Sequence, residues 1–564
     1  MAPKKRRFTF SLLAPYNDYA ALVGSWDHWK RRRKMVRDAQ GIWRADVMLA
    51  DGQYEYKFVV RSRSWFAEGQ ERFVADPLAL RLSRNRDNAI IQIADGQRVL
   101  TTYRWQHDDH PLPPNEQLII YELHVGDFTG GPGDETGQRQ KGRFSGVIEK
   151  LDYLQALGIN AIELMPVSEF PYAHSWGYSQ TSLYAVENTY GTPDDLCRLV
   201  DECHARGIRV ILDVVYNHMQ KDAPLTQIDY NYWFYRDNPD DPALDFGPKF
   251  NYEYYDEALK RFPAREHVIG AARQWVRLFH VDGMRYDCTR AIRYYDLLKW
   301  IADEADWTAG NKPFIDIAEH VPQDPTIAGY QAPMDAAWYD DLGWQLRTTI
   351  LGVYRDGRDP FNTGELLRLL DPRRDGWESA YNAVTHIDNH DHDRIMWLLG
   401  AAASTFDDAA FRRMKLGAAL LLTAPGLPMI WMGQEFGEAS PKTMDRQPLD
   451  WALLDNDRNH ALFERYQRLI AIRKANPALT SPNFEPLLNL RDRGLLAFKR
   501  WNDAGNVVVV VANLKDMYAG DFTISGGLED GVWREQIWDY DTQVQGGVLR
   551  DSLAESEVKI FIKQ

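Results

Sequence analysis

One pattern dominates the chain from about residue 117 to residue 474: short apolar segments alternate with segments of helical period. Arg209–Val215 is almost continuously apolar, as expected of a strand buried on both faces of a parallel sheet. Thr192 and Pro193 predict the start of the preceding helix, and Gly207 predicts its end. Further strands are predicted at Leu118–His124, Ala161–Met165, Gly283–Asp287, Pro313–Glu319, Ala383–Ile387 and Pro428–Met432.

Repeated strand–helix units of this kind favour an α/β fold, and over such a length they favour a (β/α)₈ TIM barrel. A doubly wound sheet is the alternative. It is disfavoured because no glycine-rich phosphate loop follows an early strand.

The two ends of the chain have a different pattern, which is typical of antiparallel β-structure. Near the N-terminus, Trp43–Met48 and Tyr54–Val60 are predicted strands, with Asp51-Gly52 as a hairpin turn between them. We expect a β-sandwich there, followed by a polar, proline-rich linker. The last part of the chain returns to strand-like patterning and predicts an antiparallel β-domain. The predicted domains are therefore 1–105, 106–474 and 475–564.

Charge and composition restrict the partners. Lys and Arg number 66 against 81 Asp and Glu, and a net charge of −15 disfavours binding to nucleic acid and anionic membranes. No apolar run approaches the roughly 20 residues that span a bilayer, and no secretory signal is expected. Three cysteines without metal-like spacing indicate reduced thiols. We therefore expect a cytoplasmic monomer that binds neither nucleic acid nor membranes and takes a neutral or cationic ligand.

Four segments place polar residues at or just after the end of a predicted buried strand: Asp213–His218, Gly283–Asp287, Ile317–Glu319 and Asn389–Asp391. A single buried carboxylate of this kind is usually structural. In a barrel, however, the carboxyl ends of the strands meet at one face, so that all four segments are expected to share one pocket. Glycoside cleavage is the chemistry that uses paired carboxylates without a cofactor.

In this order, the four segments resemble the signature regions of glycoside hydrolase family 13, the α-amylase superfamily, and the resemblance extends over most of the chain. It implies a retaining α-glucan-active enzyme that requires no cofactor. It also implies that Asp287 is the nucleophile and Glu319 the general acid/base. Asp391 is implied to hold the 2- and 3-hydroxyls of the distorted sugar and so to stabilise the transition state.

The same resemblance implies contacts around these carboxylates. Arg285 is expected to orient and ionise the nucleophile by charge pairing. Tyr178 is expected to place its ring against the sugar, and His218 and His390 to hydrogen-bond its hydroxyls.

Three further residues are expected at the edge of the site. Asp213 is expected to brace the arginine, and Trp176 lies either against the substrate or in the core. Asn217 takes the position at which some relatives bind calcium, so that a structural calcium ion is a hypothesis for this chain.

The N-terminal segment resembles the starch- and glycogen-binding module found in branching and debranching enzymes. The resemblance is carried by Leu22–Trp29 and the strand Gly52–Phe58. Trp26 and Trp29 are the rings that would stack on glucan; in many relatives, however, this module only packs against the barrel.

The reaction is less constrained. The segments Asp213–His218 and Asn389–Asp391 resemble the corresponding segments of hydrolases. Branching enzymes usually have serine at the position of Asn389 and an acidic residue at the position of His320. The segment Met334–Asp341 resembles maltooligosyltrehalose trehalohydrolases more than the other candidates. We hypothesise an α-1,4-glucan hydrolase acting on glycogen, starch or maltooligosaccharides first, a 1,4-α-glucan branching enzyme second and a trehalohydrolase third. A non-catalytic glucan-binding protein is the remote alternative, because all three carboxylates are present.

Overall fold

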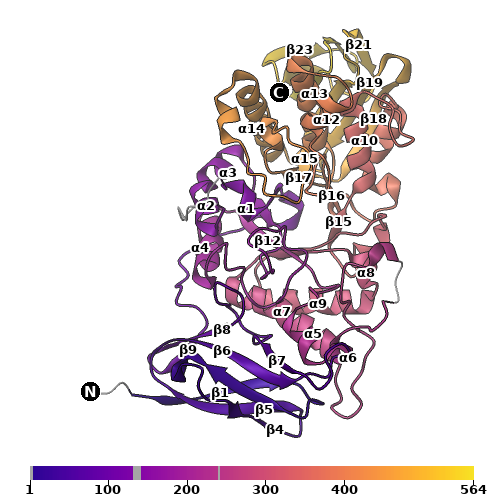
Figure 1. Ribbon diagram of the computed structural model, residues 1–564. Helices are drawn as coiled ribbons and strands as arrows, with labels where there is room; N and C mark the ends of the chain where they lie inside the picture. Colours follow the sequence, from indigo (N-terminus) through magenta and orange to yellow (C-terminus); the bar gives the residue numbers. More distant parts are fainter. Residues whose placement is uncertain (1–3, 131–141, 239–241) are drawn as a thin grey trace.

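Eight short parallel strands close into a barrel at the centre of the molecule (Figure 1). The computed structural model describes residues 4–130, 142–238 and 242–564. The strands pair in chain order, and the last pairs with the first. They are β10 (Ile120–Leu123), β11 (Ala161–Leu164), β12 (Arg209–Val214), β13 (Gly283–Tyr286), β14 (Asp316–Ala318), β15 (Ala336–Trp338), β16 (Ala383–Thr385) and β17 (Leu427–Trp431). The predicted barrel is confirmed.

Helices connect most of these strands on the outside of the barrel. They include α3 (Leu151–Leu157), α4 (Pro193–His204), α7 (Pro263–Phe279), α9 (Tyr295–Ala309), α10 (Asp340–Leu351) and α13 (Asp407–Thr423), and α14 (Asp457–Ala475) follows the last strand. One crossover departs from a regular (β/α)₈ pattern. Residues 319–335, which the structure describes throughout, contain only the 3₁₀ turn η5 (Pro325–Ile327) between β14 and β15.

Helix α4 begins where the sequence predicts. The Thr192 hydroxyl accepts a hydrogen bond from the Asp195 amide at 3.3 Å, and the Asp195 carboxylate accepts one from the Thr192 amide at 2.8 Å. This reciprocal capping satisfies two amides that the first turn leaves without helical partners. The helix ends at His204, and Gly207 then turns the chain with a φ of +67° into β12.

The N-terminal part is a sandwich of two antiparallel sheets. One sheet has the order β1 (Arg6–Leu13), β5 (Ile42–Leu49), β4 (Val36–Arg37); the other contains β3 (Arg33–Lys34), β2 (Ala20–Gly24), β6 (Gly52–Arg61), β7 (Glu71–Val74), β8 (Ala89–Ala94) and β9 (Gln97–Val99). The predicted hairpin at Asp51-Gly52 is wrong. Strand β5 pairs with β1 and β4, whereas β6 pairs with β2, β7 and β8, so the turn carries the chain from one sheet to the other.

The C-terminal part is also antiparallel, as predicted. Its main sheet contains β18 (Asn483–Leu490), β19 (Leu495–Trp501), β20 (Val507–Asn513), β25 (Val558–Lys563), β22 (Gly531–Glu535) and β23 (Tyr540–Val544), and a second sheet pairs β21 (Gly520–Ser525) with β24 (Val548–Leu553). Figure 1 shows the barrel between the two β-regions, with the N-terminal sandwich at the bottom and this domain at the top. Among the helices within the described ranges, none is both long and apolar enough to cross a membrane.

Candidate active site

Arg285 is the centre of a charged cluster at the carboxyl end of the barrel. It lies in β13 and is fully buried. Its Nη1 donates to both carboxylate oxygens of Asp213, at 2.9 and 2.8 Å, and to Oδ1 of Asp287 at 3.2 Å. Its Nη2 lies 2.9 Å from Oε2 of Glu319. One guanidinium therefore joins three of the carboxylates that the sequence places after different strands.

The residue after Asp287 completes this arrangement. Cys288 has a φ of +46°, in the left-handed region that side-chain-bearing residues rarely adopt. In this conformation its amide donates to Oε2 of Glu319 at 2.8 Å. The amides of Asp287 and Glu319 donate in turn to Val214 and Tyr286, on the neighbouring strands β12 and β13. Backbone bonds between adjacent strands thus fix the positions of both carboxylates.

The cluster carries more negative than positive charge. Burial raises the pKa of Asp287 well above its usual value, and the neighbouring Glu319 charge adds to that effect, while Arg285 opposes it. Burial also raises the pKa of Asp213, against the same arginine. Asp287 and Asp213 therefore hold protons more readily than carboxyls in water do.

Asp391 has the opposite electrostatic environment. Burial alone would raise its pKa, but the charges of His390 and Lys442 lower it to about 2. Lys442 Nζ lies 3.2 Å from Oδ1 of Asp391 and donates to its backbone carbonyl at 2.7 Å. Asp391 is therefore ionised at neutral pH.

His390 is held between two carboxylates. Its Nδ1 lies 2.7 Å from Oε1 of Glu122, and its Nε2 lies 3.5 Å from Oδ2 of Asp391. Although burial lowers its pKa, these two charges outweigh burial and raise the pKa to about 9. His390 is therefore an imidazolium at neutral pH, and both ring nitrogens can donate.

Three aromatic or imidazole side chains complete the wall of the site. Tyr178 stacks on His390, with ring centroids 5.1 Å apart, and its hydroxyl donates to Asp213 at 2.6 Å. Trp176 meets the same imidazole edge-on at 5.5 Å. His218 Nε2 lies 2.8 Å from the Tyr178 carbonyl, and burial lowers the pKa of His218 to about 4, which keeps it neutral. The structure thus brings together all the residues that the sequence assigns to the site.

Sequence reasoning missed two buried glutamates in the barrel. Glu122 in β10 and Glu163 in β11 are direct partners in the sheet register. Glu122 also accepts a hydrogen bond from the His390 amide at 3.2 Å. Neither carboxylate oxygen of Glu163 has a hydrogen-bond partner among the residues that the structure describes. Burial, with the Glu122 charge, raises the pKa of Glu163 well above the usual value. A charged residue inside an otherwise apolar strand was the available signal.

The sequence predicts a calcium ion at Asn217. Asn217 is buried beside His218, and its side-chain oxygen has no hydrogen-bond partner. Over residues 4–130, 142–238 and 242–564, no group of three or more His, Cys, Asp or Glu side chains could hold a metal ion. Calcium at Asn217 therefore stays a prediction.

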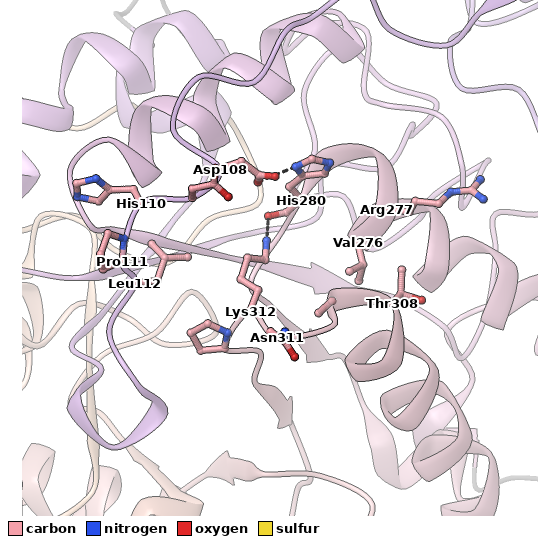
Figure 2. A pocket seen from close by; sticks show the side chains of 13 residues that line it. Asp108, His110, Pro111, Leu112, Val276, Arg277, His280, Thr308, Asn311 and Lys312 are labelled. Atoms are coloured by element: carbon pink, nitrogen blue, oxygen red, sulfur yellow. Dashed lines mark hydrogen bonds and ion pairs between the residues drawn. The ribbon is translucent and has the colours of Figure 1, made fainter.

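A further hollow lies at the other end of the barrel. This cavity of about 590 Å³ is lined by the linker and by residues that follow α7 and α9, which lead into the amino ends of β13 and β14. Figure 2 shows Asp108 facing His280 there, and Lys312 below them; His280 Nδ1 lies 2.8 Å from Asp108. None of the carboxylates around Arg285 lines it, so its role is separate from the site.

Comparison with known proteins agrees with this geometry. The family model described as "Alpha amylase, catalytic domain" matches residues 126–246, and that for carbohydrate-binding module 48, the isoamylase N-terminal domain, matches residues 1–79. The chain carries a catalytic domain of glycoside hydrolase family 13. The α-amylase resemblance and the glucan-binding-type N-terminal module are both confirmed.

Individual relatives of this family 13 chain differ in activity. A malto-oligosyltrehalose trehalohydrolase of Saccharolobus solfataricus is 31% identical over 379 residues, 60% of each chain. The 1,4-alpha-glucan branching enzyme GlgB of Nocardia farcinica is 26% identical over 96% of this chain and 73% of its own. Pullulanase type I of Bacillus subtilis, solved with maltose, matches at a TM-score of 0.80 and 20% identity over 100% of this chain and 85% of its own. The chain thus spans only 60% of the trehalohydrolase, and the pullulanase likeness concerns the fold.

Proposed function

We propose that the protein is a retaining glycosidase that cleaves α-1,4-glucosidic bonds of glycogen- or starch-type glucans and maltooligosaccharides. The observation that supports this most strongly is the contact of one buried guanidinium, that of Arg285, with Asp213, Asp287 and Glu319. A retaining mechanism needs a nucleophile and an acid about 5–5.5 Å apart. Asp287 and Glu319 contact the same guanidinium, at 3.2 and 2.9 Å, and are the two carboxylates to which the proposal assigns these roles.

In the proposed first step, Glu319 acts as the acid and supplies a proton. Glu319 gives it to the departing glycosidic oxygen while Asp287 attacks the anomeric carbon, and a covalent glucosyl-enzyme forms. In the second step an acceptor attacks that carbon, the bond to Asp287 breaks, and Glu319 takes the acceptor's proton. Arg285 keeps Asp287 able to ionise despite its burial.

The remaining groups bind the sugar in this proposal. Asp391 is ionised at neutral pH and can accept hydrogen bonds from the 2- and 3-hydroxyls of the sugar. His390 can donate from Nε2, and Tyr178 and Trp176 offer ring faces. His218 is neutral and donates from Nε2 to the Tyr178 carbonyl, so it can only accept a hydrogen bond from a hydroxyl at Nδ1.

The acceptor decides the reaction type: water gives hydrolysis and a sugar 6-hydroxyl gives branching. Branching is the second candidate, because branching enzymes match this chain over 95–97% of its length. Trehalose release is the third, given the similarity to trehalohydrolases.

One set of incubations separates these reactions. The protein is incubated with amylose and, separately, with maltooligosyltrehalose, and new reducing ends, α-1,6 linkages and free trehalose are measured. We expect reducing ends from amylose without new branches. New branches without a net gain of reducing ends would replace hydrolysis by transfer, and rapid trehalose release with little attack on amylose would favour the third candidate.

A further inference from the structure

A second pocket lies where the N-terminal sandwich meets the barrel. It encloses about 480 Å³, and six of its lining residues are Trp65, Phe66, Lys221, Tyr230, Arg236 and Asp245. We call it the junction pocket. Trp65 and Phe66 come from the loop between β6 and β7, and the other four from the long segment after β12. Figure 1 shows β7 beside the short helices α5 (Pro224–Ile228) and α6 (Tyr230–Trp233) of that segment.

The aromatic rings of the pocket are exposed, although they lie at an interface. Trp65 is 52% exposed and Phe66 38% exposed. Both rings contact Tyr230 edge-on, with centroids 6.5 and 6.1 Å apart. Rings that served only to join the two domains would be buried, because burial is the source of their stabilisation.

The attachment of the loop to the barrel depends on other contacts. The Ser62 hydroxyl donates to the Gln227 carbonyl at 2.7 Å, and the Arg63 amide donates to the Ile228 carbonyl at 2.9 Å. These bonds fix the loop on α5 and leave the faces of Trp65 and Phe66 available to a ligand.

The polar groups of the pocket point to a neutral, hydroxyl-rich ligand. Lys221 and Arg236 are balanced by Asp222 and Asp245. The third basic residue of the lining, Lys249, is buried and donates to the Ala291 carbonyl, so the exposed charges favour neither an anion nor a cation. The Arg236 guanidinium lies 5.7 Å from the centre of the Trp65 ring and offers several N–H donors beside an aromatic face. Flat rings bordered by hydrogen-bonding groups suit a pyranose, which has apolar C–H faces and an equatorial ring of hydroxyls.

One segment of the chain joins the junction pocket to the carboxylate site. Phe246, 48% exposed and adjacent to Asp245, lies 5.6 Å from the His218 ring. His218 also forms a β-bridge with Lys249, which lines the pocket. The segment 245–249 therefore lines the junction pocket and also contacts His218, a residue of the carboxylate site.

From these observations we infer that the junction pocket binds an outer part of the same α-glucan chain whose reacting bond lies at Asp287. The inference rests on the proposed function for the identity of the ligand. Trp65 and Phe66 of the N-terminal module and Tyr230 of the barrel would share one glucan, so that long chains bind better than short ones.

The test is glycogen affinity electrophoresis in an Asp287→Ala background, in which the glucan is not consumed. We expect Trp65→Ala to raise the apparent Kd for glycogen about tenfold, the effect of losing about one strong aromatic contact. Trp65→Phe keeps a ring and should recover most of the affinity. The matched control is Trp307→Ala on α9, a tryptophan that is 78% exposed and outside the pocket; it should bind like the parent.

Turnover by the otherwise wild-type enzyme keeps the two proposals apart. For Trp65→Ala, KM for long amylose should rise while kcat changes less than twofold. If the apparent Kd of Trp65→Ala for glycogen lies within twofold of the parent's, the inference about the junction pocket is wrong. The proposed function would still stand if the wild-type enzyme turns over glucan. If glycogen slows migration only when Trp65 is present, but the wild-type protein turns over no glucan, the junction pocket would stand and the proposed function would fall. If Trp65→Ala fails to fold, Arg236→Ala provides the same comparison, and unchanged binding by it would equally reject the pocket.

Discussion

Replacing Arg285 by leucine should destabilise the barrel in a pH-dependent way. The guanidinium donates two hydrogen bonds to Asp213, at 2.9 and 2.8 Å, and both groups are buried. In Arg285→Leu the Asp213 carboxylate would be left buried with only the Tyr178 hydroxyl as a partner among these contacts. Breaking a buried pair in this way costs about 3–5 kcal/mol.

Asp213 can escape this cost by binding a proton. From its ordinary pKa of 3.8, protonation costs about 4 kcal/mol at pH 7 and about 1.6 kcal/mol at pH 5, at 1.36 kcal/mol per pH unit. The penalty of Arg285→Leu should therefore shrink by more than half between these two pH values.

Differential scanning calorimetry at pH 5 and pH 7 measures this difference as a change in Tm. A fall of about 5 °C at pH 7 is expected, and a clearly smaller one at pH 5. Asp213→Leu/Arg285→Leu, which removes both charges, should be more stable at pH 7 than Arg285→Leu alone. Equal Tm losses at the two pH values, or a double variant less stable than the single one, would refute the reasoning.

Three further changes test other parts of the structure. The Tm of Glu163→Gln should rise relative to that of wild type as pH rises from 5.5 to 7.5. Because the raised pKa keeps Glu163 protonated in the folded state, the wild-type protein loses stability as pH rises above the pKa of the unfolded chain. A constant Tm difference would contradict this. The stability of His267→Gln should rise relative to that of wild type as pH falls from 7 to 5. Burial lowers the pKa of His267 to about 3, so that over this range only the unfolded wild-type chain binds a proton there. Thermal melts at both pH values measure the sign of the change. Thr192→Ala should lower the free energy of unfolding by about 1 kcal/mol, because it removes the N-cap of α4. The control Thr192→Ser keeps a capping hydroxyl and should retain most of that free energy.

Much of the fold could be predicted because its signals are local. The buried strand Arg209–Val215 and the capped helix after Thr192 are recognisable from a few neighbouring residues. Strand β15 (Ala336–Trp338) was missed because it contains no β-branched residue, unlike the equally short β14 and β16. The hairpin at Asp51-Gly52 was wrong because the turn sequence does not specify to which sheet the next strand belongs.

The site was predictable to a similar extent. Asp213 and Arg285 lie near the carboxyl ends of barrel strands, and Asp287, Glu319 and Asp391 follow such strands. Closure of the barrel alone brings such residues together. Lys442 was missed because it comes from a loop, where no periodicity places a side chain against Asp391. The Cys288 amide was missed as well, since a backbone conformation of φ +46° leaves no mark in the sequence.

The central claim is that Asp287 carries the sugar during turnover, and trapping the intermediate tests it most directly. The enzyme is incubated with 5-fluoro-α-glucosyl fluoride, quenched in acid and digested, and the labelled peptide is sequenced by mass spectrometry. We predict one added fluoroglucosyl group on Asp287, and none in Asp287→Asn. A label on another residue, or full activity with inversion at the anomeric carbon and no label, would contradict the account.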